Sequence, residues 1–99
     1  MPRGSARLRT TDARQNLSGQ RVREGRKALK LSQPKLCERL LAATDGSWNP
    51  TIYDLSRIEG GRRIVSDIEL SVLAQALECS PCWLLTGEEP AKSVGDAPS

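Results

Sequence analysis

The stretch LSQPKLCERL, residues 31–40, decides how we expect this chain to fold. Ser32 is a good helix cap, and Pro34 fits the first turn of a helix, where its missing amide hydrogen costs no hydrogen bond. Leucines then recur at helical spacing, at Leu36, Leu40 and Leu41. The stretch therefore predicts an amphipathic helix over residues 33–43.

A second helix signal follows after a polar break. Residues 44–47, TDGS, end the helix before them, and the sequence NPT at residues 49–51 offers both a capping side chain and a proline for a new start. We expect a helix over residues 51–59. The two glycines at residues 60–61 stop it, because glycine takes the left-handed backbone angles of a helix end without steric cost.

Further helices are expected on both sides of this pair. Asn16 or Ser18 opens one helix, whose apolar positions are sparse. They are Leu17, Val22 and Leu29. Ser66 and Glu69 fit a capping box, and Pro81 starts a short last helix. The expected helices cover roughly residues 17–29, 33–43, 51–59, 67–77 and 81–86. No strand-length alternating run interrupts them, so the sequence predicts an all-α fold.

Several of these segments also carry residue motifs in register. Residues 31–40 resemble the pattern LSQ..LA..L, and residues 55–63, LSRIEGGRR, resemble ISRIE.G.R. Residues 65–77 look like the helix that follows in such proteins, and residues 79–87, CSPCWLLTG, look like the ending VS..WLL.G. Over about residues 17–87 the chain therefore resembles the XRE and phage-repressor family of helix-turn-helix proteins. The resemblance implies a five-helix, lambda-repressor-like DNA-binding domain.

One departure from the family pattern concerns the turn before the helix at residues 51–59. The family usually has a tight turn there, whereas in this chain about eight extra residues lie between Leu41 and Thr51. Some XRE-like proteins carry a longer turn with Trp-Asp, and Trp48-Asn49 looks like that variant. We expect Trp48 to anchor the turn in the core, because a tryptophan among polar loop residues needs a place to pack.

The resemblance implies a sequence-specific DNA-binding transcriptional regulator, expected to be a repressor, with the helix at residues 51–59 in the major groove. That groove accepts one α-helix and displays base edges as a donor and acceptor code. By alignment with the family, the expected base contacts are Gln33, Thr51, Ile52, Tyr53, Asp54 and Arg57. The expected phosphate contacts are Lys35, Arg62 and Arg63, with the arginines before residue 16 as further candidates.

Other roles remain open for some of these residues. Arg57 can bond a guanine edge, or it can form an ion pair with Glu38 or Glu59 inside the protein. Asp54 can accept from cytosine or orient Arg57. Arg62 and Arg63 can bind phosphates or simply lie in a solvated loop.

The charge distribution divides the chain. The chain has fifteen Lys and Arg residues and twelve Asp and Glu residues, which gives a net charge of +3. The excess of positive charge lies mostly within residues 1–30. Residues 1–15 are polar and basic without apolar periodicity, so we expect a disordered basic arm. Residues 16–87 form the expected helix-turn-helix domain. Residues 88–99 are slightly acidic and rich in helix-breaking residues, which predicts a disordered tail.

Composition argues against several other classes of protein. The chain has no histidine, no glycine-rich phosphate loop and no cluster of carboxylates, so we expect no catalysis and no cofactor. No run approaches the roughly 18 apolar residues of a membrane span, and residues 1–16 lack the apolar stretch of a signal peptide. We therefore expect a cytoplasmic protein without a membrane partner.

The three cysteines admit two interpretations. Cys79 and Cys82 form a C-x-x-C sequence at a helix start, a setting found in redox and zinc sites. With no histidine and no second C-x-x-C, we expect no metal, and we expect reduced thiols that pack as small side chains. Cys37 stands where the family has a core-facing alanine. Trp83, Leu84 and Leu85 either complete the core or form a dimer contact.

The expected partners are a double-stranded DNA operator and a second copy of the chain, because a two-fold operator is read by a homodimer. The alternative is a protein-interaction module, such as an antitoxin, or a helix-turn-helix fold without DNA binding. The weakly polar sequence Ile52-Tyr53-Asp54 keeps that alternative open.

Overall fold

The computed structural model describes residues 8–88, which contain five α-helices and no strand. The helices are α1 (Gly19–Ala28), α2 (Gln33–Ala43), α3 (Ile52–Glu59), α4 (Asp67–Ala76) and α5 (Pro81–Thr86). Each lies within one or two residues of its expected place, so the all-α, five-helix class is confirmed. The outer parts of the expected disordered arm and tail, residues 1–7 and 89–99, lie outside the described residues.

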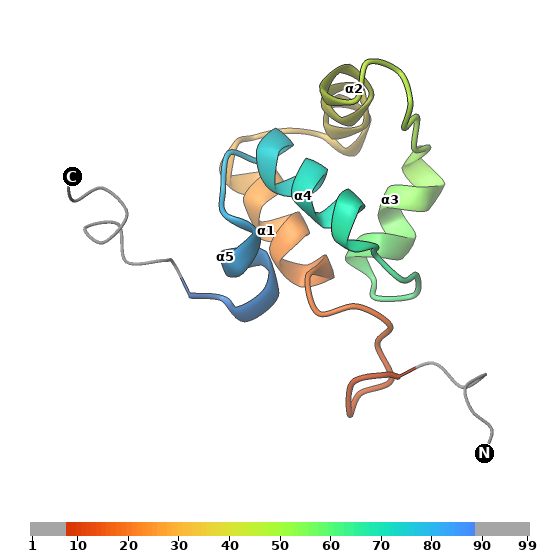
Figure 1. Ribbon diagram of the computed structural model, residues 1–99, viewed down its shortest axis with the longest axis vertical. Helices are drawn as coiled ribbons and strands as arrows, with labels where there is room; N and C mark the ends of the chain where they lie inside the picture. The colour runs from red at the N-terminus through yellow and green to blue at the C-terminus, as the bar shows by residue number, and fades with distance from the viewer. Residues whose placement is uncertain (1–7, 89–99) are drawn as a thin grey trace.

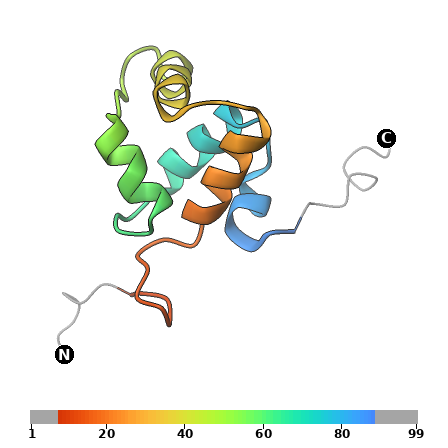
Figure 2. The same cartoon turned by 180° about the vertical axis from the view of Figure 1, so that it is seen from behind.

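Each helix packs mainly against two others. Helix α1 contacts α3 and α5, α2 contacts α3 and α4, and α4 contacts α5. In Figure 1, α2 lies across the top and α3 forms one side, with α1 and α4 between α3 and α5. Figure 2 shows the same order from behind. Helix α3 is therefore a peripheral helix, packed on one side and open on the other.

The core is aliphatic. Its fully buried side chains are Val22, Leu36, Leu40, Leu55, Ile58, Leu73 and Leu84. Cys37, Trp48 and Trp83 are partly buried and pack against this cluster, which confirms the expected anchor for the long turn. Leu17 differs from expectation, because it is 59% exposed. It precedes the first residue of α1 and so does not share the inward face that Val22 occupies.

Side-chain caps explain where the helices begin. Ser32, Thr51, Ser66 and Ser80 each accept a hydrogen bond from an amide three residues on. The expected capping box of Ser66 and Glu69 is present. Helix α1 is capped differently, because the Asn16 side chain accepts from the Gly19 amide while Ser18 makes no side-chain cap.

Glycines end α3 and α5. Gly61 has φ +76° and Gly87 has φ +82°, the left-handed region that favours glycine. Gly60 has φ −84°, so of the glycine pair only Gly61 makes the turn. A Cβ atom at Gly61 would lie 2.6 Å from the guanidinium carbon of Arg14. Gly61 is thus favoured by its backbone angles, and a larger residue there would also force the Arg14 guanidinium to move.

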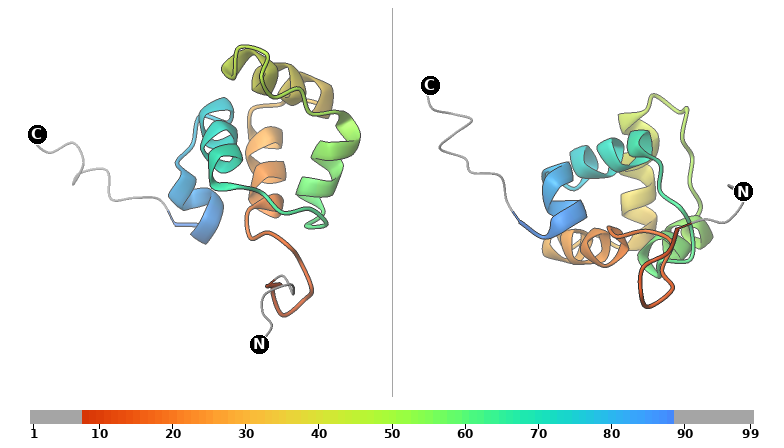
Figure 3. Two further views of the ribbon diagram at one scale, coloured as in Figure 1. Left: turned by 45° about the vertical axis from the view of Figure 1, so that its right-hand side comes forward. Right: turned by 60° about the horizontal axis from the view of Figure 1, so that its bottom comes forward.

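The long connection between α2 and α3 is held by hydrogen bonds. The Thr44 hydroxyl donates to the Leu40 carbonyl at 2.9 Å and accepts from the Trp48 amide at 3.0 Å. Pro50 is buried just before α3 starts. These contacts fix the path of the chain from α2 to α3, which Figure 3 shows from two further sides.

Residues 10–15, within the arm that the sequence predicts to be disordered, make contacts with one another and with the end of α3. The Gln15 amide donates to the Gly61 carbonyl at 2.8 Å, and the Arg14 guanidinium donates to the Glu59 carbonyl at 3.0 Å. The Thr10 hydroxyl also accepts from the Arg14 amide. The chain is ordered here because the end of α3 offers carbonyl acceptors that local sequence patterns do not reveal.

Candidate nucleic-acid interface

Helix α3 has one packed side and one solvent side. Leu55 and Ile58 are fully buried, and the Glu59 carboxylate also points inward. At the start of the helix, Ile52 is 47% exposed, and Tyr53, on the side opposite the buried residues, is 70% exposed. The residues aligned with base-reading positions therefore include a contiguous exposed pair at the first turn of α3.

Arg57 lies on the same side as Tyr53, one helical turn further on. Its guanidinium carbon lies 5.7 Å from the centre of the Tyr53 ring, a cation–π contact. It also donates to the Arg62 carbonyl at 3.2 Å. The ion pair with Glu38 or Glu59, which the sequence left open, is not among those formed in residues 8–88. The positive charge of Arg57 thus stays available to a partner.

Thr51 and Asp54 cap α3. The Thr51 hydroxyl accepts from the Asp54 amide at 3.1 Å, and the Asp54 carboxylate accepts from the Thr51 amide at 2.9 Å. This hydrogen bond from the Thr51 backbone is the main reason that the pKa of Asp54 lies below its ordinary value. The Asp54 carboxylate, expected either to accept from a base or to orient Arg57, thus caps α3, and the nearby charges of Arg63 and Arg57 lower its pKa further.

Gln33 connects the start of α2 to α3. Its amide nitrogen donates to the Ser56 hydroxyl and to the Glu59 carboxylate, both at 3.3 Å. The side chain is half-buried beside the solvent side of α3. Its carbonyl oxygen is the atom left to accept a hydrogen bond from a base.

A buried ion pair supports this arrangement, and sequence reasoning missed it. Arg26 donates to both carboxylate oxygens of Glu59, at 2.8 and 3.1 Å, and to the Leu31 carbonyl at 2.9 Å. These contacts tie α1 to α3 and to the start of α2. A signal was present in the sequence, because Arg26 follows Val22 by four residues and so lies on the inward face of α1.

The three expected phosphate ligands differ in their surroundings. Lys35 is exposed and lies 3.6 Å from Glu38. The exposed Arg62 side chain forms no ion pair within residues 8–88. Arg63 instead donates two hydrogen bonds of 2.9 Å to Glu69, which raise its pKa. The charge of Arg63 is thereby balanced by Glu69, so Arg62 is the better phosphate ligand of the two.

The three cysteine thiols are not part of the exposed side of α3. None of the three cysteines forms a disulfide. Burial raises the pKa of the Cys37 thiol, with smaller contributions from the charges of Asp54 and Glu59. Cys82 is exposed, with its sulfur 3.7 Å from the Thr86 hydroxyl. Within residues 8–88, no group of three His, Cys, Asp or Glu side chains is placed to hold a metal ion.

The chain matches no family model, no curated protein and no solved structure. Its likeness to the XRE family is carried by the motifs in the sequence. No helix of the described part of the chain is long and apolar enough to span a membrane.

Proposed function

We propose that this protein is a sequence-specific DNA-binding transcriptional regulator, a repressor of the XRE type with a lambda-repressor-like domain. The observation that carries the proposal is the solvent side of α3. It presents Ile52 and Tyr53 at the first turn, with the unpaired cation of Arg57 stacked on the Tyr53 ring. A peripheral helix with this surface suits insertion into a groove about 12 Å wide.

Each exposed group of α3 has a chemical counterpart in the major groove. Arg57 can donate two hydrogen bonds to a guanine edge, and Ile52 can contact a thymine methyl group. The Thr51 hydroxyl, which already accepts from the Asp54 amide, keeps its hydrogen to donate to a phosphate. Base specificity then rests on Arg57 first, because a bidentate contact discriminates more strongly than an apolar one.

Phosphate contacts supply most of the affinity in this proposal. Lys35 lies at the start of α2, and Arg62 follows the end of α3. Both side chains are exposed, and the Lys35–Glu38 contact at 3.6 Å is weak enough in water for a phosphate to displace it. Their charges therefore position α3 without reading sequence.

The proposed regulator acts in the cytoplasm as a homodimer, at least on DNA. Two copies related by a two-fold axis would read two half-sites about one helical turn apart. Monomeric binding with one-to-one stoichiometry on every tested site would contradict this part of the proposal.

A second candidate is a protein-interaction module, such as an antitoxin, that uses the same helix. The observation in its favour is also specific, because Ile52 and Tyr53 expose an apolar surface at the tip of α3. Such a pair suits a hydrophobic pocket on a partner protein as well as a thymine methyl group.

Selection of duplexes from a pool with a random core separates the two candidates. The wild-type protein should enrich a defined sequence, and fluorescence anisotropy should give an affinity for the enriched duplex at least 1,000-fold above that for unselected duplex. Enrichment of no sequence, with equal affinity for all duplexes, would overturn the proposed function and leave the interaction module as the better account.

A further inference from the structure

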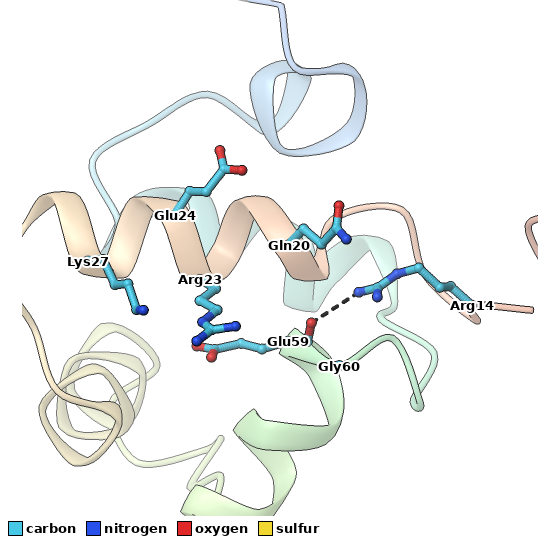
Figure 4. A pocket seen from close by; sticks show the side chains of 7 residues that line it. All are labelled: Arg14, Gln20, Arg23, Glu24, Lys27, Glu59 and Gly60. Atoms are coloured by element: carbon cyan, nitrogen blue, oxygen red, sulfur yellow. Dashed lines mark hydrogen bonds between the residues drawn. The ribbon is translucent and has the colours of Figure 1, made fainter. Parts of the chain in front are cut away.

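A basic concave surface lies where α1 meets the end of α3. It consists of two adjoining hollows of about 570 and 460 Å³, which share Arg23, Glu59 and Gly60. We call it the α1–α3 cleft; besides Arg26, its charged lining residues are the cations Arg14, Arg23, Lys27 and Arg62 and the carboxylates Glu24 and Glu59. Figure 4 shows the first hollow, with Arg23 and Lys27 reaching from α1 towards the end of α3 and Glu24 pointing away.

The cleft carries a net positive charge that the protein does not neutralise. Glu59 is buried and its charge is balanced by Arg26. Within residues 8–88, neither Arg23 nor Lys27 forms an ion pair. The repulsion among such cations is relieved when a polyanion binds, so the cleft attracts negatively charged partners.

Contacts within the protein explain the position of one of these cations, Arg14, but not of the others. Arg14 donates to the Glu59 carbonyl, so it serves as a cap for the end of α3. Arg23, Lys27 and Arg62 are exposed, and their side chains make no hydrogen bond within the described residues. No internal contact accounts for gathering these three charges along the two adjoining hollows of the cleft.

We propose that the α1–α3 cleft binds successive phosphates of one DNA strand, beside the segment read by α3. This inference rests on the proposed DNA-binding function and extends it to α1. The second hollow reaches Gln33 and Ser56, which border the solvent side of α3. A strand that contacts α3 can therefore continue past Arg62 to Arg23 and Lys27.

A DNA backbone fits this surface better than a small phosphate ligand. Sites for small molecules enclose most of the ligand and are lined mainly by apolar side chains. The α1–α3 cleft is lined mainly by charged and polar side chains, and its two hollows adjoin at Arg23, Glu59 and Gly60. Cations spread along a track match a strand that carries one charge about every 3.4 Å.

The test compares three variants that each remove one positive charge. Arg23→Gln and Lys27→Gln alter the cleft, and Lys30→Gln is the matched control, because Lys30 is exposed just after α1 and does not line the cleft. The measured quantity is the slope of log affinity against log salt concentration, with the duplex enriched by the wild-type protein. Circular dichroism checks that each variant folds.

Each cleft variant should lower the magnitude of the salt slope by about 0.9, the value for one phosphate contact. Affinity for enriched and unselected duplexes should fall by the same factor, because a phosphate contact carries no sequence information. Lys30→Gln should keep the wild-type slope. Equal slopes for all four proteins on a duplex that the wild-type protein still selects would overturn the cleft proposal alone.

A titration with inorganic tripolyphosphate, without DNA, separates a backbone site from a site for a free anion. We expect binding no tighter than about millimolar, since three phosphates engage only part of the track. Micromolar binding that Arg23→Gln abolishes, together with unchanged DNA slopes, would overturn the proposal in favour of a free-anion site. Failure of the wild-type protein to enrich any duplex would instead contradict the proposed function itself.

Discussion

Arg26 and Glu59 form a bidentate ion pair at 2.8 and 3.1 Å, with 11% and 6% of their side-chain surfaces exposed. The pair joins α1 to α3, and the same carboxylate also accepts from Gln33 at the start of α2. The orientation of α3 relative to α1 and α2 therefore depends on the buried carboxylate of Glu59. A surface that is proposed to read DNA is positioned by a residue that faces away from it.

Glu59→Ala should destabilise the fold by about 3–5 kcal/mol, because it leaves the Arg26 charge buried without a partner. Urea unfolding followed by circular dichroism measures the change. The double variant Arg26→Met/Glu59→Leu serves as the control, since replacing a buried pair with apolar residues of similar volume is often neutral or stabilising. A loss below about 1 kcal/mol for Glu59→Ala would show that water reaches the pair.

Asn16→Ala should cost about 2–3 kcal/mol of stability. The Asn16 side chain accepts from the Gly19 amide at 2.8 Å and donates to the carbonyls of Ile58 and Arg63 at 3.1 and 2.8 Å. Asn16→Asp should not restore the loss, because a carboxylate cannot donate to those two carbonyls. Thermal denaturation compares both with Gln15→Ala, which removes only an exposed contact of 3.5 Å.

The ion pair of Arg63 and Glu69 predicts a pH dependence of stability. The hydrogen bond from Arg63 is the largest cause that holds the pKa of Glu69 below its ordinary value of 4.5. A carboxylate with a lowered folded-state pKa stabilises the fold above its unfolded pKa, and the contribution is lost as pH falls through the folded value. The free energy of unfolding should therefore drop below pH 4.5 in part through this group.

Glu69→Gln isolates that contribution, because glutamine keeps the capping box with Ser66 but carries no charge. At pH 7 the variant should be less stable than the wild-type protein by about 1–2 kcal/mol. The difference should shrink as the pH is lowered below 4.5 in a series of urea titrations. A difference that stays constant down to pH 2.5 would contradict the assignment.

Arg57→Ala and Arg62→Ala should affect DNA binding in different ways. Arg57→Ala should cost about 1–3 kcal/mol on the enriched duplex and much less on unselected DNA. Arg62→Ala should weaken both duplexes alike and lower the magnitude of the salt slope by about one. Anisotropy titrations at several salt concentrations measure both effects.

Arg63→Ala is the informative comparison for these two variants. Because Arg63 is engaged by Glu69, its removal should lower the stability of the protein and change the salt slope less than Arg62→Ala does. If instead Arg63→Ala gave the larger slope change, Arg63 would have to leave Glu69 on DNA. Unchanged affinity for every DNA in both Arg57→Ala and Arg62→Ala would favour the protein-interaction module.

Thiol labelling should distinguish Cys82 from Cys37. Cys82 is exposed, whereas Cys37 is partly buried and burial raises the pKa of its thiol. Because the thiolate is the reactive form, iodoacetamide at pH 8 should modify Cys82 well before Cys37. Peptide mapping by mass spectrometry gives the order, and Cys82→Ser should remove the fast phase. Modification of Cys37 first would mean that α2 opens readily from the core.

The candidate site was only partly predictable from the sequence. Ile52 and Tyr53 are exposed at the start of α3, as the alignment leads us to expect, since the helix start and the buried Leu55 and Ile58 determine which residues face out. Asp54 and Arg63 were aligned with DNA contacts, and the structure gives them Thr51 and Glu69 as partners. A charged side chain pairs with an oppositely charged or polar group that the fold brings close to it. An alignment of sequence motifs contains no information about which groups are close in space.

The sequence by itself determined where the helices lie, as the caps Ser32 and Ser66 illustrate, and that Leu36 and Leu40 of α2 face inward. Helix caps and helical periodicity involve residues about three or four positions apart, so they can be recognised in the sequence. Only the tertiary structure decided that Arg26 meets Glu59, 33 residues away, and that Asn16 reaches the end of α3. Those contacts depend on how the helices pack, because a buried polar group must take whichever partner the packing brings within hydrogen-bond distance.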